Sequence, residues 1–183
     1  MKGIVFTAFL DMVEQDFGDL VVETIIDRSE LPHGGAYTAV GSYPAAEMVR
    51  LVTALSQESR LPVPALLEAF GRSLFGGLHR SYPHFFGGGD LFDFLASIHT
   101  YIHVEVKKLY RDAELPSLVV EQRTPDRLAL RYASPRCMGD LARGLLKASI
   151  AHFGNPDVAL AEERLTPDGS QVRFVLSRAM PVV

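Results

Sequence analysis

Two histidines one helical turn apart are the first residues whose types and spacing could carry chemistry. His99 and His103 stand at positions i and i+4, so they share a face if the segment is helical. Three interpretations fit this spacing. The pair could be ordinary, partly buried histidines, or a non-haem zinc or iron site, although neither the glutamate of the zinc-protease helix nor a third ligand is evident. One of them could instead be the axial ligand of a haem iron. The spacing alone leaves all three open.

A second group of chemical interest is the run Tyr132-Ala133-Ser134-Pro135-Arg136. Tyr132, Ser134 and Arg136 alternate, so an extended chain would present all three on one face. All three can donate hydrogen bonds, and the arginine guanidinium pairs bidentately with carboxylates. The run is therefore a candidate clamp for an anion. The alternative is a solvated strand end that Pro135 closes.

Composition excludes several other classes of function. The sequence contains neither a phosphate-binding loop nor a nucleophile elbow nor a motif for covalent haem attachment. Cys137 is the only cysteine, which rules out an internal disulfide and is typical of a reducing compartment; a small buried hydrophobe is its expected role. The formal net charge of −4, without a basic run, argues against nucleic-acid binding.

The sequence also argues against a membrane segment. The apolar run at the N-terminus is broken by Asp11 and Glu14, so it does not continue as a signal peptide. No apolar stretch approaches the roughly 20 residues that a membrane span requires. We therefore expect a cytoplasmic protein without a membrane anchor.

Hydrophobic periodicity predicts the elements that must position these residues. Apolar residues recur at helical spacing through the first two thirds of the chain, whereas the last third alternates between strands and one helix. The predicted helices cover 3–17, 19–28, 45–56 (capped by Ser42), 64–79, 91–110 (capped by Asp90 after the glycine loop 87–89) and 138–153. The predicted strands cover 117–123, 127–133, 158–165 and 171–177. This order predicts an α+β fold with one antiparallel sheet.

Together, the two groups resemble the H-NOX (haem nitric oxide/oxygen binding) family, to which the haem domain of soluble guanylate cyclase is related. The resemblance rests on the helix 98–110, on the Tyr-x-Ser-x-Arg motif that begins 29 residues after His103, and on Met1-Lys2-Gly3, Asp11-Met12-Val13 and Ala69-Phe70-Gly71. It covers essentially the whole chain. It implies about seven helices, a four-stranded antiparallel sheet and a haem buried between two lobes. It also implies a single domain over 1–183, with an N-terminal helical lobe over about 1–62 and a haem-ligating lobe over about 63–183.

The resemblance implies a role for each candidate residue. His103 corresponds to the iron ligand of a non-covalent haem b, whereas the position of His99 is not used for iron. Tyr132, Ser134 and Arg136 correspond to the clamp on the haem propionates, and Pro116 to a proline pressed on the porphyrin. The residues that correspond to the lining of the distal pocket are Val5, Phe9, Leu74, Leu78, Leu141 and Leu145.

The implied function is a nitric oxide sensor. Oxygen-binding relatives hold O₂ with a distal tyrosine, and the matching position here is Leu141; Phe9 and Leu74 also lack a donor. We therefore expect binding of NO and CO without stable binding of O₂. Since no output domain is apparent, the expected partner is a separate bacterial histidine kinase or cyclic-di-GMP enzyme. A non-haem metal enzyme that uses His99 and His103, and a haem carrier without a signalling role, are the alternatives.

Overall fold

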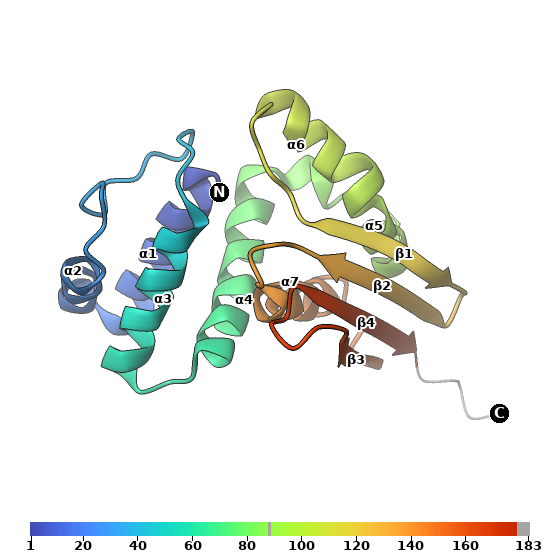
Figure 1. Ribbon diagram of the computed structural model, residues 1–183. Helices are drawn as coiled ribbons and strands as arrows, with labels where there is room; N and C mark the ends of the chain where they lie inside the picture. Colours follow the sequence, from blue (N-terminus) through green and yellow to red (C-terminus); the bar gives the residue numbers. More distant parts are fainter. Residues whose placement is uncertain (88, 179–183) are drawn as a thin grey trace.

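The computed structural model of the protein describes residues 1–87 and 89–178. Helices fill the first part of the chain, and four strands follow with one helix between the second and the third (Figure 1). The helices are α1 (Gly3–Phe17), α2 (Asp19–Arg28), α3 (Ala45–Ser59), α4 (Val63–Ser81), η1 (a 3₁₀-helix, Pro83–Phe85), α5 (Leu91–Ser97), η2 (a π-helix, Ile98–Ile102), α6 (His103–Leu109) and α7 (Gly139–His152). The strands are β1 (Ser117–Arg123), β2 (Arg127–Ala133), β3 (Val158–Arg164) and β4 (Gln171–Arg178). The predicted α+β fold is confirmed.

The predicted element boundaries hold to within three residues, but one predicted cap is wrong. Helix α3 begins at Ala45, with Pro44 as its N-cap residue and no side-chain cap. Ser42 lies two residues before that cap, too far out to reach the free amides of the helix. Its hydroxyl instead donates a hydrogen bond to the Asp112 carboxylate at 2.5 Å. Ser42 thus ties the loop before α3 to the segment after α6.

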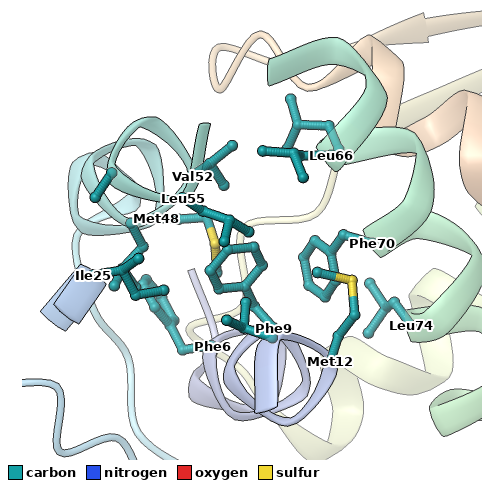
Figure 2. Packing of buried hydrophobic residues seen from close by; sticks show 14 of the residues in the cluster. Phe6, Phe9, Met12, Ile25, Met48, Val52, Leu55, Leu66, Phe70 and Leu74 are labelled. Carbon is teal, nitrogen blue, oxygen red and sulfur yellow. The ribbon is translucent and has the colours of Figure 1, made fainter. Parts of the chain in front are cut away.

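One hydrophobic core joins α1, α2 and α3 to the first half of α4. The apolar side chains of these helices recur every three or four residues, so each helix turns one stripe toward the others (Figure 2). Phe9 and Phe70 meet edge to face at its centre, with ring centroids 5.2 Å apart. Burying a side chain of this size contributes about 1.5–3 kcal/mol, so this cluster holds α1 firmly against α4.

A second core lies between the sheet, α5 and α7. The sheet is wholly antiparallel, in the order β1-β2-β4-β3. Alternation along β2 and β4 directs one set of side chains to the covered face. The buried members of this set are Leu128, Leu130, Tyr132, Val172, Phe174 and Leu176. Tyr132 therefore points to the same side of the sheet as α7.

Helix α4 contributes to both cores and packs along α7. Phe70 and Leu74 belong to the first cluster, whereas Phe75 belongs to the second. Gly71 allows close approach, because a Cβ added there would lie 2.8 Å from the Cα of Gly144. The two helices therefore touch backbone to backbone.

The segment predicted as one helix over 91–110 contains a π-turn. Asp90 caps α5 as predicted, since its carboxylate accepts a hydrogen bond from the Asp93 amide at 2.9 Å. The helix then widens over η2 and returns to α-helical geometry at His103. A π-turn inserts one extra residue and rotates everything after it, and such turns are frequent at functional sites. Gly88 of the predicted loop 87–89 and residues 179–183 lie outside the described residues.

Within the described ranges, no helix combines the length and the apolar composition that crossing a membrane requires.

Candidate functional site

A cavity of about 240 Å³ lies where α1, α4, α7, the η2–α6 segment and the sheet meet. Nine of the eleven residues singled out from the sequence line it: Val5, Leu74, His103, Pro116, Tyr132, Ser134, Arg136, Leu141 and Leu145. These residues come from six separate parts of the chain. The fold therefore brings the histidine, the donor triad and the apolar positions to one place.

Phe9 and Leu78 do not line this cavity. Phe9 is fully buried and turns toward Phe70, as Figure 2 shows. Leu78 is partly buried and packs against the same N-terminal core. Phe9 lies on α1 and Leu78 on α4, and both helices border the cavity. Their side chains, however, pack in the N-terminal core and do not face the cavity.

His103 presents a half-buried imidazole to the cavity. Its Nδ1 is buried and has no hydrogen-bond partner among the described residues. Burial, aided by like charge at His99 and Lys107, lowers the pKa of His103 to about 4, so the ring is neutral at pH 7. The backbone of Pro116 acts in the opposite direction and raises this pKa, but burial and the two neighbouring charges outweigh it. A neutral imidazole with free nitrogens in an apolar pocket is suited to ligating a metal.

His99 is placed differently. Its side chain is exposed and does not line the cavity, and its ring centroid lies 6.2 Å from that of His103. The described residues contain no group of three or more histidine, cysteine or acidic side chains arranged to hold a metal ion. The two histidines therefore differ in environment despite their shared helical register.

The donor triad lines the same cavity as the apolar positions. Tyr132 and Ser134 are each only 5% exposed. The strand ends at Ala133, and the turn that follows still carries Ser134 and Arg136 to the cavity. Burial raises the pKa of Tyr132, so its hydroxyl remains a donor at neutral pH. Such buried donors favour an acceptor or an anion between them.

Arg136 pairs with Glu114, a partner that an anion in the cavity could replace. Its guanidinium donates to the Glu114 carbonyl at 2.5 Å and to the Glu114 carboxylate at 3.2 Å. The Glu114 side chain is 83% exposed, whereas that of Arg136 is 13% exposed. Pairs with such an exposed carboxylate contribute about 0–1 kcal/mol, so a buried anion could displace it.

The sequence reasoning missed two cationic groups at this polar end. Met1 and Lys2 line the cavity, and the Met1 ammonium donates to the Tyr43 carbonyl at 2.7 Å. Burial, together with the charge of Arg136, lowers the pKa of this ammonium. Met1-Lys2-Gly3 contributes to the family resemblance, but no local pattern places these residues at the cavity, which they approach only through the packing of α1 against the rest of the chain. Together with Arg136 they are the cationic groups of the lining, while the Lys2 ammonium pairs with Asp112 and Arg136 with Glu114.

Helix α7 and its N-cap residue Met138 supply six of the lining residues, including Ser149, whose helical spacing from Leu141 and Leu145 could have identified it. Its cavity-lining residues recur at three- and four-residue spacing: Met138, Leu141, Ala142, Leu145, Leu146 and Ser149. Ser149 is 3% exposed and is the polar member of this face. Its hydroxyl donates to the Leu145 carbonyl at 2.9 Å, within the same helix. The wall is therefore apolar in character, with its one hydroxyl already engaged.

These features fit a flat, largely apolar group that carries a metal at its centre and carboxylates at one edge. A neutral imidazole on one wall could hold the metal, and the triad with its neighbouring cations could hold the carboxylates. The apolar wall of α7 would cover the other face. Haem is a group of this description.

Comparison with known proteins agrees with this geometry. The sequence profile of the Haem-NO-binding family matches residues 2–160. Among curated proteins the sequence has no match.

Several solved structures share the fold over nearly all of the chain. The A71G mutant of the Fe(II) unliganded H-NOX protein from K. algicida is 39% identical, with a TM-score of 0.94 over 100% of this chain and 98% of its own. The IWP-051-bound H-NOX from Shewanella woodyi, in the Fe(II)CO state, is 35% identical, with a TM-score of 0.80 over 100% and 97%. The S. oneidensis H-NOX protein in the Fe(II)NO state is 28% identical, with a TM-score of 0.86 over 98% and 100%.

Proposed function

The chain belongs to the Haem-NO-binding (H-NOX) family, a family of haem-binding gas sensors, and from this premise we propose that it is a nitric oxide sensor. It binds NO and CO at ferrous haem b, excludes O₂ and regulates a separate signalling protein. When bound, the haem supplies an iron that takes up diatomic gases. The chain's own residues determine how firmly the haem is held and which gas is retained.

The observation that carries the proposal is the half-buried imidazole of His103, whose buried Nδ1 has no hydrogen-bond partner among the described residues, in the same cavity as the donor triad. Leaving a buried polar atom without a partner costs about 1–3 kcal/mol. The ring therefore has bonding capacity that the described part of the chain does not use, and its pKa of about 4 keeps it unprotonated and able to ligate iron. His103 is the iron ligand in this proposal.

Tyr132, Ser134 and Arg136 would hold the haem carboxylates. Tyr132 and Ser134 are buried donors, and Arg136 would exchange its exposed Glu114 partner for a carboxylate inside the cavity. A charge-assisted hydrogen bond of this kind is worth about 1.5–3 kcal/mol. Pro116, which also lines the cavity, would press on the haem from the side of His103.

Selectivity would follow from the apolar wall. Bound O₂ acquires negative charge and is retained by a hydrogen-bond donor, which NO does not require. Val5, Leu74 and Leu141 offer no donor, and the hydroxyl of Ser149 is committed to the Leu145 carbonyl. We therefore expect weak retention of O₂ beside strong binding of NO.

Signalling would act through a separate partner. A bacterial histidine kinase or cyclic-di-GMP enzyme in the cytoplasm is our proposal, and nucleic acid is disfavoured by the net charge of −4. Loss of the bond at His103 would release α6 from the cavity. A shift of this segment relative to the N-terminal helices is a change that a partner could recognise.

Optical spectroscopy of the purified protein tests the proposal. Haem-loaded protein should show a Soret band that changes when NO or CO is added to the reduced form and stays unchanged with O₂. Absence of any haem band after expression with adequate haem would contradict haem binding and favour the non-haem alternative. A haem spectrum together with a partner whose activity ignores NO would instead support the haem carrier.

A further inference from the structure

We propose a second metal site, distinct from the cavity, in which His79 and His152 bind one divalent late-transition-metal ion such as Zn²⁺, Ni²⁺ or Cu²⁺. The two side chains line a separate surface hollow of about 630 Å³ between α4 and α7. Imidazole is a preferred ligand of these ions. The site uses neither His99 nor His103, so it does not depend on haem binding.

The spacing of the two rings is that of two imidazoles on one ion. Their centroids lie 4.5 Å apart, with an interplanar angle of 59°. Two imidazoles bound to one ion at metal–nitrogen distances of about 2.0–2.1 Å have centroids roughly 4.5–5 Å apart. Neither ring makes a hydrogen bond to the described part of the protein, so their nitrogens are free for a ligand.

Aromatic neighbours hold both rings in place. His79 packs edge to face on Phe86, with centroids 5.2 Å apart, and His152 packs against Phe75 at 5.5 Å. Rings fixed in this way lose less rotamer entropy when they bind an ion. The pair is thus partly organised before a metal arrives.

The local electrostatics favour a cation at this end of the helices. Contacts advance in the same direction along α4 and α7, from Gly71 with Gly144 to His79 with His152, so the two helices run parallel. His79 lies in the last turn of α4, and His152 is the last residue of α7. Each helix C-terminus carries a partial negative charge equivalent to about half an elementary charge. Two such ends meet at the proposed site.

Cationic side chains on the rim of the hollow offset the negative charge of the two helix ends only in part. Arg72 and Lys147 also line it, but both pair with the carboxylate of Glu68. Arg72 lies seven residues before His79, about 10 Å along the helix, which is close to the screening length at physiological salt. Arg80 is exposed, and its guanidinium lies near Gly76 on the wall of the hollow, so it is a third cation beside the site.

A bound ion would join the C-terminal ends of α4 and α7. Because α4 contributes side chains to both cores, this link would stabilise the whole chain and not only a surface turn.

The test uses the full, haem-loaded chain after chelator treatment, titrated with NiCl₂, ZnCl₂ or CuCl₂. At a hundredfold excess of free metal over its Kd, the melting temperature should rise by roughly 5–10 °C. His79→Gln and His152→Gln should each weaken metal binding by roughly tenfold or more. The matched control is His84→Gln, which alters a nearby histidine outside the hollow and should bind metal like the wild type.

Spectroscopy separates this site from the haem cavity. Cu²⁺ bound at the proposed site should show electron paramagnetic resonance couplings to two nitrogen atoms, while the Soret band stays unchanged. Equal metal binding by the wild type and the His79→Gln/His152→Gln double variant would overturn the proposal. So would a loss in His84→Gln as large as in the two site variants, or a Soret shift that tracks metal binding.

Discussion

Gly71 of α4 and Gly144 of α7 face each other backbone to backbone, and neither position has room for a side chain. A Cβ on Gly144 would lie 2.9 Å from the Cα of Gly71, and a Cβ on Gly71 would lie 2.8 Å from the Cα of Gly144. Real Cβ atoms do not approach backbone so closely, so a methyl group here must push the helices apart. The walls of the cavity that come from α4 and α7 depend on this contact.

The first prediction concerns this crossing. Gly144→Ala should lower the free energy of unfolding by about 1–3 kcal/mol, because the cost of overpacking exceeds the gain in helix propensity. Chemical denaturation measures the change. Gly77→Ala is the matched control, since a Cβ at that helical glycine meets nothing within 4 Å. Gly77→Ala should raise the free energy of unfolding. If Gly144→Ala were as stable as Gly77→Ala, α4 and α7 would be able to move apart without a loss of free energy.

The second prediction concerns the proposed iron ligand. His103→Gly removes the imidazole from the cavity and should abolish stable haem loading, because no other described histidine lines that cavity. Added imidazole should restore haem content, measured from the Soret band. His99→Ala serves as the control and should keep the wild-type spectrum. Retention of native haem content and spectrum by His103→Gly without imidazole would remove His103 from its role.

The third prediction concerns the carboxylate clamp. Arg136→Ala should accelerate haem loss by roughly ten- to a hundredfold, which corresponds to one charge-assisted hydrogen bond of about 1.5–3 kcal/mol. Transfer of haem to an acceptor protein measures the rate. Glu114→Gln removes only the exposed partner of Arg136, so it should not speed haem loss. If a triple variant of Tyr132, Ser134 and Arg136 lost haem at the wild-type rate, the clamp would be absent.

The fourth prediction concerns gas selectivity. Leu141→Tyr should introduce a donor on the apolar wall and strengthen O₂ binding by roughly ten- to a hundredfold. Leu141→Phe is the matched control, because it adds the same ring without the hydroxyl. Absorption spectra of the reduced protein in air should change with O₂ only in the tyrosine variant. A lasting spectral change with O₂ in the wild type would contradict the absence of a donor. The hydroxyl of Ser149 would then be the candidate donor.

The fifth prediction concerns acid stability. Burial raises the pKa of Glu68, but hydrogen bonds from Lys147, Arg143 and Arg72 outweigh this and lower it from 4.5 to about 2. The unfolded chain therefore binds a proton that the folded chain does not between about pH 2 and 4.5. The stabilising contribution of Glu68 is complete above pH 4.5 and is lost as the pH falls toward 2.

Denaturation at several pH values checks this. Glu68→Gln should lower the stability at pH 7 by roughly 1–3 kcal/mol and flatten the dependence on pH below 4.5. Glu58→Gln, which breaks a more exposed pair with Arg28, should change stability by less than about 1 kcal/mol. An unchanged pH dependence in Glu68→Gln would mean that other carboxylates dominate acid unfolding.

The sequence by itself determined the elements and their faces. Helical spacing located the helices to within a few residues, with α5, η2 and α6 predicted as one helix, and strand-favouring runs between turn residues located the four strands. The same local regularity showed that Tyr132, Ser134 and Arg136 could act together. A resemblance carried by these residues and by His103 then identified the family, which the match over residues 2–160 confirms.

Tertiary structure decided which of these faces meet. Val5 and Phe9 lie four residues apart, one turn of α1. Phe9 nevertheless packs in the N-terminal core, whereas Val5 lines the cavity. His79 and His152 are 73 residues apart in the chain, and only the close crossing of α4 and α7 brings their rings together. Spacing along one element fixes the direction of a side chain relative to its neighbours, but its partner depends on how separate elements pack. That packing is decided by long-range contacts that no local pattern encodes.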